Sequence, residues 1–230
     1  VRSLEDQNPW NEPLVFRDIW NPYTASHRLI NLLVGLNLYE RANGVVNVYA
    51  ATTIRGHLQR CAAYIVNNLE RDLQFNHLLK NFVALAVYAT GLPHVPQGWG
   101  FLEVDTLVTV DQNFLADGGH AERTPMYHLL GLQDLKLLRA TDLFPGTWPA
   151  CLDKVIRSAE DALCLLAHPD GDISLFNDSW LGEGPAAADI VASAVIPGRH
   201  DLLDTGYVRL DAGADIIIFD VGPCGPDENP

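Results

Sequence analysis

The sequence predicts a mainly α-helical fold in which antiparallel helix hairpins are followed by the first strands of an antiparallel β domain. Six segments between residues 24 and 167 repeat apolar side chains every three or four residues, as amphipathic helices do. The links between them are short, which makes consecutive helices antiparallel neighbours, and repeated hairpins of this kind commonly curl into a ring. After Ala167 the apolar spacing changes to that of strands.

Residues 1–23 precede the helices and are rich in Trp, Pro and Asn without any periodicity. We expect an extended lead-in that lays Trp10, Phe16 and Trp20 on the domain. The helical domain is expected to span residues 24–167, and a β domain to begin at residue 168.

The first three helices have clear apolar faces and clear ends. The first begins at Thr24 and ends near Gly44, since glycine favours the C-terminal cap of a helix. The third begins near Asn76 and is broken by "TGLPHVPQGWG". The apolar faces of these helices hold Leu29, Ile30, Leu33 and Leu36, then Ile54, Leu58, Ala62, Ile65 and Leu69, then Leu79, Phe82, Val83 and Ala86.

The next three helices include a break at the polar stretch "DGGHAERTPMYH". The fourth helix ends at Asp117–Gly119. Thr124 then supplies a hydroxyl cap and Pro125 the first position of the fifth helix, which runs to about Leu138. The sixth begins around Trp148 and continues to Leu166. So polar a turn between two amphipathic helices raises the question of what it is for.

Strand signals begin after the last helix. "HPDGDISLFNDS" is a Gly/Asp turn that leads into a short strand, and residues 206–210 and 214–220 form two more strands joined by an Ala-Gly turn. Two strands alone do not make a stable sheet. Residues 168–230 are therefore expected to be the start of a β-sandwich domain.

Composition limits the classes of function. The 230 residues are 48% hydrophobic with a net charge of −14. Residues 168–230 hold 12 acidic side chains against 2 basic ones, and no basic stripe points to nucleic acid. The longest apolar run, residues 82–92, is about half a membrane span, which predicts no transmembrane helix.

The sequence predicts no metal or cofactor. None of the four cysteines lies in a CxxC pair or has a His at metal-site spacing, so we expect Cys61 and Cys164 to be buried free thiols. Asp170, Asp172 and Asp178 resemble a fragment of a calcium loop but lack its remaining spacing, which favours turn chemistry.

Four motifs together resemble one family. "QFNHLLKNFVAL", "FLADGGHAERTPMYH", "GDISLFNDS" and "GYVRLDAGADIIIFDVGPCGPDENP" are similar to segments of the heparinase II/III-like polysaccharide lyases, in the same order. The likeness is greatest to bacterial members often found with surface-polysaccharide genes. It implies an incomplete α/α toroid, a following multi-stranded antiparallel β domain, and a catalytic cleft between them. It also implies β-elimination on uronate-containing chains without a redox cofactor.

The resemblance assigns three catalytic residues. Asn76 and His77 match the family's Asn-His pair, and Tyr127 in "TPMYH" matches its catalytic Tyr. The family continues past the equivalent of Pro230 with a His-rich segment that supplies a further active-site His. This segment is absent here, so the chain alone is expected to have little activity without the missing C-terminal β domain or a partner chain. The expected partner is an anionic polysaccharide, and a periplasmic or extracellular location is favoured.

The chemistry explains these residue types. β-Elimination removes the C5 proton of a uronate and expels the oxygen on C4, which requires neutralisation of the carboxylate. Asn76 and His77 offer N–H donors for that purpose. Tyr127 can act as base and acid if neighbours lower its pKa, and Arg123 and His128 flank it in sequence.

Less specific roles remain open for the same residues. Asn76 can be a helix cap with His77 packed on the next helix, and Tyr127 can be a core aromatic. The substrate-binding candidates are Arg123, His128, His120 and Glu122. His120 and Glu122 can equally hold the turn, and Arg123 can pair with Glu122 or Asp117. The remaining histidines show no partner pattern and are expected at surface or packing positions: His27, His57, His94, His168 and His200.

Two other functions compete with a lyase. A glycoside hydrolase needs two carboxylates across a cleft, and Asp117 and Glu122 are the only candidates in the polar turn. A non-catalytic glycan-binding or assembly subunit would keep the toroid without the β-domain histidines.

Overall fold

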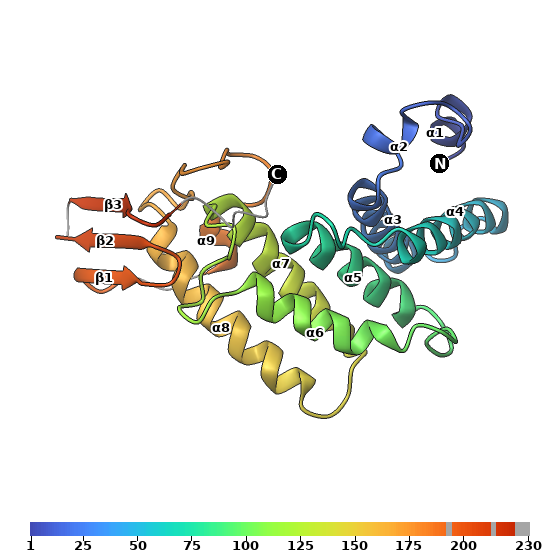
Figure 1. Ribbon diagram of the computed structural model, residues 1–230. Coiled ribbons are helices and arrows are strands. Elements are labelled where there is room, and N and C mark those ends of the chain that lie inside the picture. The colour runs from blue at the N-terminus through green and yellow to red at the C-terminus, as the bar shows by residue number, and fades with distance from the viewer. Residues whose placement is uncertain (192–194, 213–214, 224–230) are drawn as a thin grey trace. The chain divides into compact units, whose positions relative to one another are not determined.

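The computed structural model describes residues 1–191, 195–212 and 215–223. Contacts divide the chain into two compact units, Val1–Val104 and Asp105–Pro230. The first unit contains α1 (Arg2–Gln7), α2 (Val15–Asp18), α3 (Pro22–Asn43), α4 (Val48–Asn67), α5 (Phe75–Thr90) and the first residues of α6 (Phe101–Asn113). The second contains the rest of α6, α7 (Pro125–Thr141), α8 (Trp148–Leu166), α9 (Ala187–Ile190), β1 (Gly198–Leu202), β2 (Tyr207–Asp211) and β3 (Ile216–Asp220) (Figure 1). The limits 24–167 and 168–230 for the two domains stay a prediction.

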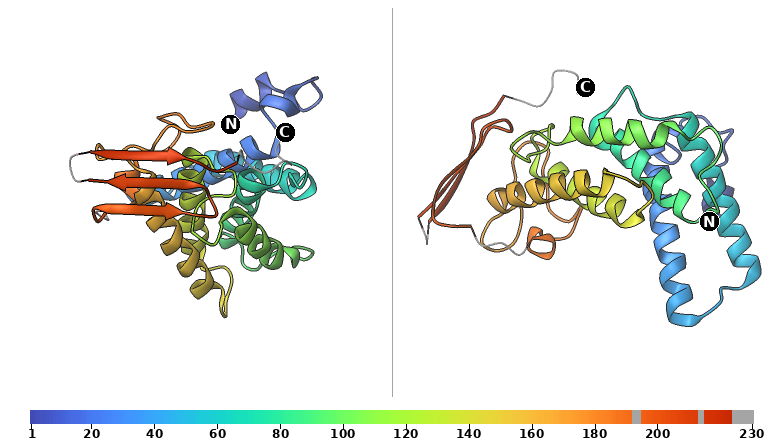
Figure 2. Two further views of the ribbon diagram at one scale, coloured as in Figure 1. Left: turned by 60° about the vertical axis from the view of Figure 1, so that its left-hand side comes forward. Right: turned by 90° about the horizontal axis from the view of Figure 1, so that it is seen from below.

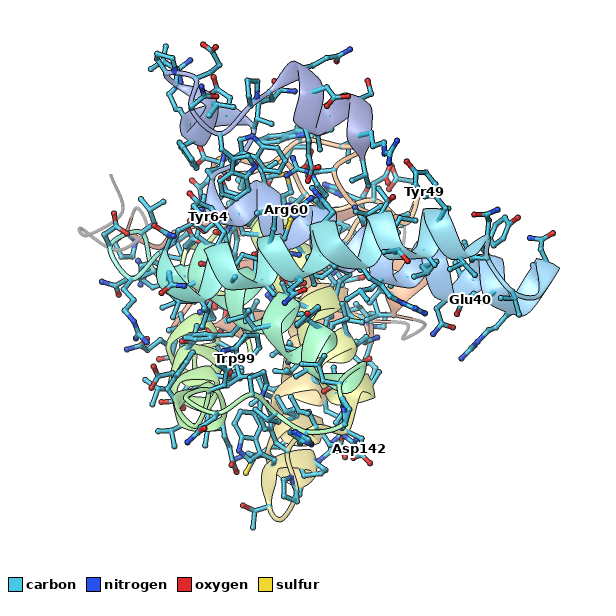
Figure 3. The ribbon with its side chains drawn as sticks, turned by 90° about the vertical axis from the view of Figure 1, so that its right-hand side faces the viewer. Glu40, Tyr49, Arg60, Tyr64, Trp99 and Asp142 are labelled. Atoms are coloured by element: carbon cyan, nitrogen blue, oxygen red, sulfur yellow. The ribbon has the colours of Figure 1, made fainter. Side chains whose placement is uncertain are left out.

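The lead-in differs from the expected extended segment, because α1 and α2 lie within it. Its aromatic residues nevertheless anchor it to the first unit as expected. Trp20 is fully buried and stacks on Trp10 at 4.9 Å between ring centroids, and Trp10 contacts Tyr64 of α4 edge-on at 5.3 Å. Figure 3 looks onto α4, where Tyr64 and Arg60 lie along the helix. The burial of these rings stabilises short helices that the local sequence alone cannot hold.

Three helices, α3, α4 and α5, pack against one another to form the first unit's core. α3 begins where the Asn21 side chain accepts a hydrogen bond from the backbone N–H of Thr24, and it ends at Gly44, whose φ of +79° suits glycine. α3 and α4 run antiparallel as a hairpin (Figure 2). The largest fully buried aliphatic and aromatic side chains between these helices include Leu29, Leu58, Ile65, Leu79 and Phe82.

The second unit begins with a helical layer. α7 packs against α8, with Leu132 and Leu135 of α7 and Leu163 of α8 fully buried. The positions of α3 to α8 confirm the six helices predicted from apolar periodicity. α9 is a short additional helix that four residues could not announce by periodicity.

A three-stranded antiparallel sheet in the order β1-β2-β3 follows the helices. β2 and β3 confirm the two predicted strands, whereas the strand expected directly after the Gly/Asp turn is only a single bridge between Ala167 and Ile173. The sheet begins instead at Gly198. The predicted Ala-Gly turn includes Gly213, which lies outside the described residues.

The two faces of the sheet differ in what covers them. Tyr207 and Arg209 lie on the buried face, and the Arg209 guanidinium donates to the carbonyls of Cys164 and Ala167 at the end of α8. These bonds satisfy carbonyl groups that a helix end leaves without intrahelical partners. On the opposite face, β2 and β3 pair Leu210 with Ile217, and both side chains are exposed.

Three further findings concern the membrane-spanning potential of the helices, metal ligands and the cysteines. Within the described ranges, none of the helices is long and apolar enough to cross a membrane. No cluster of three His, Cys, Asp or Glu side chains in the same ranges could hold a metal ion. Cys61 and Cys164 are buried free thiols, as predicted. Asp170 forms a turn by accepting the N–H of Asp172 at 3.0 Å.

Candidate functional site

The Asn76-His77 pair lies in the first turn of α5. Gln74 occupies the cap position, so Asn76 is not the helix cap. Gln74 and Phe75 both have positive φ angles, +58° and +36°, which non-glycine residues adopt at a cost of about 1–3 kcal/mol each. Asn76 is buried, whereas the side chain of His77 is 39% exposed. The His77 side chain is therefore accessible at the start of α5.

A buried carboxylate holds the His77 ring. Glu70 Oε1 lies 3.2 Å from His77 Nδ1, and Glu70 Oε2 accepts a hydrogen bond from Asn81 Nδ2 at 2.8 Å. The Asn81 side chain also accepts the backbone N–H of Glu70 at 3.0 Å. Glu70 is 7% exposed and Asn81 is fully buried. No local pattern in the sequence predicted a role for Glu70 or Asn81.

Aromatic and basic groups from α3 and α5 surround the same ring. Tyr23 lies 4.4 Å from His77 and 4.7 Å from His27 between ring centroids. Burial lowers the pKa of His27 to about 4, with smaller contributions from the charges of Lys80 and His77. His27 is consequently neutral near pH 7. It was expected only at a packing or surface position, and its place beside His77 was not foreseen.

In the second unit, Asp117 explains much of the polar turn. Its Oδ1 accepts the N–H of Gly119 at 3.0 Å and the Thr205 hydroxyl at 2.7 Å. Its Oδ2 accepts the backbone N–H groups of Asp204 and Thr205 at 2.8 and 2.7 Å. The carboxylate thus joins the turn after α6 to the turn between β1 and β2.

The two glycines of this turn are required by close packing. Gly118 has a φ of +85°, and a Cβ there would overlap the Ser158 carbonyl of α8. A Cβ at Gly119 would overlap the Thr205 side chain. The sequence "DGG" therefore lets the turn lie directly on α8 and on the β1–β2 turn.

His120 is buried and structural. Its Nδ1 accepts the backbone N–H of Glu122 at 3.2 Å, so Nε2 carries the proton and donates to Asn113 Oδ1 at 3.1 Å. Burial lowers the His120 pKa to about 3, with a smaller contribution from His128. The 3.9 Å approach to the Glu122 carboxylate therefore involves a neutral ring. His120 is 1% exposed, and its assignment to substrate binding stays a prediction.

His128 is also a packing residue. It is 1% exposed, and its Nε2–H donates to the carbonyl of Ala159 in α8 at 2.8 Å. Burial lowers its pKa to about 4. The ring is therefore neutral near pH 7, and its assignment to substrate binding stays a prediction. Glu122 is 8% exposed and lies in the same buried layer.

Arg123 is partly exposed and has a φ of +53°. Its guanidinium donates to the carbonyls of Pro223 and Asp204, at 3.3 and 3.4 Å. Its own carbonyl accepts the Tyr207 hydroxyl at 2.6 Å and Asn177 Nδ2 at 2.7 Å. Arg123 thus links the start of α7 to the sheet, and its contact with substrate stays a prediction.

The N-terminus of α7 is capped differently from the prediction. Pro125 occupies the first helical position as expected, but Thr124 makes no side-chain cap hydrogen bond. The hydroxyl of Ser179 accepts the N–H of Met126 at 3.1 Å instead. The cap therefore comes from a segment more than 50 residues away, and the Thr124 hydroxyl donates to the Glu122 carbonyl.

Tyr127 lies in the first turn of α7 and is partly exposed. Burial raises the pKa of its hydroxyl, and the charges of Asp178 and Glu122 and a hydrogen bond with Asp178 raise it further. The expected lowering by Arg123 and His128 is absent from these causes. The Tyr127 hydroxyl therefore keeps its proton near pH 7, and its catalytic role stays a prediction.

The second unit brings Tyr127 together with Asn177, Asp178 and Ser179. The motif "GDISLFNDS" contributed to the family resemblance, but no individual role was predicted for these three residues. Their partners are about 50 or more residues away, so spacing in the sequence gave no signal. The approach of Asn76 and His77 to Tyr127 stays a prediction.

Comparisons with known proteins identify the family of this chain. Residues 2–195 fit the family model described as Heparinase II/III N-terminus. The chain belongs to the heparinase II/III N-terminal family. No curated protein is similar enough in sequence to be recognised as its relative.

Solved structures of heparinases share the fold of this family member. A crystal structure of heparinase III matches 99% of the chain with a TM-score of 0.72 and 17% identity, and the chain covers 41% of that protein. A mutant of heparan sulfate lyase HepC from Pedobacter heparinus matches 97% of the chain with a TM-score of 0.63 and 17% identity, over 40% of its length. The family member thus has the predicted incomplete α/α toroid followed by the start of an antiparallel β domain. It spans about two-fifths of the length of these matched structures.

Proposed function

We propose that this protein contributes the toroid side of a polysaccharide lyase that cleaves uronate-containing glycans by β-elimination. The proposal depends on one observation about Tyr127. In a heparinase-family fold, its side chain lies partly exposed at the start of α7 and its raised pKa keeps the phenol protonated. Asn76 and His77 complete the proposed site. The proposal requires that their side chains reach the same sugar ring as Tyr127.

The roles follow from the state of each group. The C5 proton leaves to a base, the electron pair of its bond forms the C4–C5 double bond, and the C4–O bond breaks. Asn76 stabilises the charge that develops on the uronate carboxylate, a large contribution when a donor is positioned in advance. Tyr127 donates its proton to the departing oxygen, because its raised pKa keeps that proton in place near pH 7.

The two carboxylates that a glycoside hydrolase would use, Asp117 and Glu122, have structural roles here. Asp117 uses both carboxylate oxygens to hold the β1–β2 turn, and Glu122 lies buried beside His120. Two carboxylates flanking a glycosidic bond need to face an open cleft. A lyase with a tyrosine acid is therefore favoured over a two-carboxylate hydrolase.

The test is a lyase assay on the complete gene product with heparan sulfate, alginate and bacterial surface polysaccharides. Ultraviolet absorbance of the unsaturated uronate measures product. Tyr127→Phe should lower kcat by about 100-fold or more, since general acids contribute at least that much, and should leave glycan binding almost unchanged. Tyr39→Phe is the matched control, because Tyr39 is an exposed tyrosine of α3.

Three outcomes would contradict the proposal. Full activity of Tyr127→Phe would remove the acid role from Tyr127. Saturated products would show hydrolysis. Glycan binding by the complete gene product without any cleavage would identify a non-catalytic binding subunit.

A further inference from the structure

We infer that Glu70 is a positioning residue for His77, and that Asn81 holds Glu70 in place so that His77 presents Nε2 to the substrate. The inference rests on the proposed function, since it assigns a protonation geometry to one residue of that site. It concerns residues of the first unit only, and its geometry can be measured without any activity.

The orientation of the Glu70 carboxylate is determined by Asn81. The Asn81 amide oxygen accepts the Glu70 backbone N–H at 3.0 Å, so its Nδ2 must face the Glu70 side chain. Nδ2 donates to Glu70 Oε2 at 2.8 Å and also lies 3.3 Å from the Ser26 hydroxyl oxygen. With Oε2 occupied, Oε1 is the oxygen that faces His77 Nδ1. Glu70, Asn81 and Ser26 are all buried, where hydrogen bonds are costly to break.

This arrangement determines which ring nitrogen of His77 carries the proton. An ionised carboxylate only accepts hydrogen bonds, so Nδ1 must be the donor. The neutral ring then carries a lone pair on Nε2, and the ring has an N–H there only when it is protonated. Second partners of a histidine commonly decide its tautomer in this way.

This tautomer assigns the removal of the C5 proton and the protonation of the departing oxygen to two different residues. A neutral His77 cannot donate from Nε2 to a uronate carboxylate, whereas it can accept the C5 proton at that atom. The resulting imidazolium keeps its Nδ1–H on Glu70, which stabilises the new positive charge. Tyr127 then gives its proton to the departing oxygen, and a second proton transfer restores both groups after product leaves.

Tyr23, His27 and Lys80 form the rest of the cluster around His77. Tyr23 stacks on the ring at 4.4 Å with planes tilted by 31°. His27 lies beyond Tyr23 and is neutral near pH 7, and Lys80 contributes a positive charge to this cluster. Glu70 is the carboxylate in direct contact with the His77 ring.

Nitrogen-15 NMR of histidine-labelled protein tests the geometry directly. The wild-type spectrum should show neutral His77 as the Nδ1–H tautomer, and Glu70→Gln should invert it to Nε2–H. The reason is that Asn81 Nδ2 still needs an acceptor, so the carbonyl of the introduced glutamine turns to Asn81 and its NH2 group faces His77 Nδ1. Asp72→Asn is the control, because Asp72 is an exposed acid two residues away, and it should leave the tautomer unchanged.

A wild-type Nε2–H tautomer would overturn the inference without the need for any variant. Retention of Nδ1–H in a folded Glu70→Gln protein would also overturn it. This measurement stays decisive if the variant fails to fold, since the wild-type spectrum alone can contradict the assignment.

Activity of the complete gene product tests the catalytic consequence. Glu70→Gln should lower kcat by about 100-fold with little change in KM, because Nε2 can no longer accept the proton. An unchanged kcat with an inverted tautomer would overturn the positioning role. Absence of activity in the wild type would overturn the proposed function, whereas the NMR result would still judge the Glu70–His77 geometry.

Discussion

Replacement of Asp117 by Ala should weaken the second unit more than any surface charge change. The carboxylate accepts four hydrogen bonds, from Gly119 N, Asp204 N, Thr205 N and the Thr205 hydroxyl. Gly119 and Thr205 are buried, with Thr205 at 1% exposure. Asp204 is exposed, and water can replace the carboxylate at its N–H.

The magnitude follows from the donors that would be left without an acceptor. A buried donor without an acceptor costs roughly 1–3 kcal/mol, so the N–H groups of Gly119 and Thr205 together cost about 4 kcal/mol. In a chain of this size, that loss corresponds to a decrease in Tm of roughly 10 °C. The small Ala side chain itself adds no strain at this position.

Urea denaturation and amide hydrogen exchange measure the loss. Exchange of the Gly119 and Thr205 amides should become faster in Asp117→Ala, together with the decrease in the free energy of unfolding. Asp111→Ala is the matched control, because Asp111 is an exposed residue of α6 in the same unit. A loss below about 1 kcal/mol, equal to that of the control, would refute the structural role of Asp117.

Two further predictions concern the start of α7. Ser179→Ala should speed hydrogen exchange of the Met126 amide and lower the free energy of unfolding by about 1 kcal/mol, the usual contribution of a helix cap. Thr124→Val should leave the exchange rate of the Met126 amide unchanged. The reverse result would return the cap to Thr124. Asp178→Asn should lower the raised pKa of Tyr127, since the substitution removes an acidic neighbour and an acceptor of the phenol proton. Ultraviolet or NMR titration of the Tyr127 hydroxyl measures this pKa. The pKa of Tyr127 is raised in the folded state. The stability that the protonated hydroxyl contributes should therefore be complete below the pKa of about 10 in the unfolded chain, and should be lost as pH rises through the pKa in the folded chain. A titration identical to that of the wild type would contradict the role of Asp178.

The helices were predictable because their apolar periodicity is a property of neighbouring residues. β1 was missed for the opposite reason. "GRHDL" has no alternating apolar pattern, and the segment is a strand because it pairs with β2 along its whole length. The Ser179 cap was missed in the same way, since Thr124 also satisfies the local rule and tertiary structure selects between the two hydroxyls.

In the candidate site, too, some residues could be predicted from sequence motifs and others depend on tertiary contacts. Its three proposed catalytic residues came from the family resemblance, whereas Glu70 and Asn81 act through contacts that no local pattern announces. His128 follows Tyr127 in the chain, but successive helical residues point about 100° apart, so one faces α8 and the other is partly exposed. Sequence adjacency therefore could not tell which of the two side chains is buried against α8 and which is partly exposed.

The polar turn between α6 and α7 connects the sheet to the helix that carries Tyr127. Arg123 immediately precedes the cap position of α7, and its carbonyl accepts the Tyr207 hydroxyl from β2 and the Asn177 amide from the loop that carries Asp178. Asp117 holds the β1–β2 turn against the same stretch of chain. A shift of β2 would consequently move the Arg123 carbonyl, the first turn of α7 and Tyr127 with them. The sheet is thus part of the framework that orients the proposed acid, because positioning at a reacting atom is sensitive to displacements of about 1 Å.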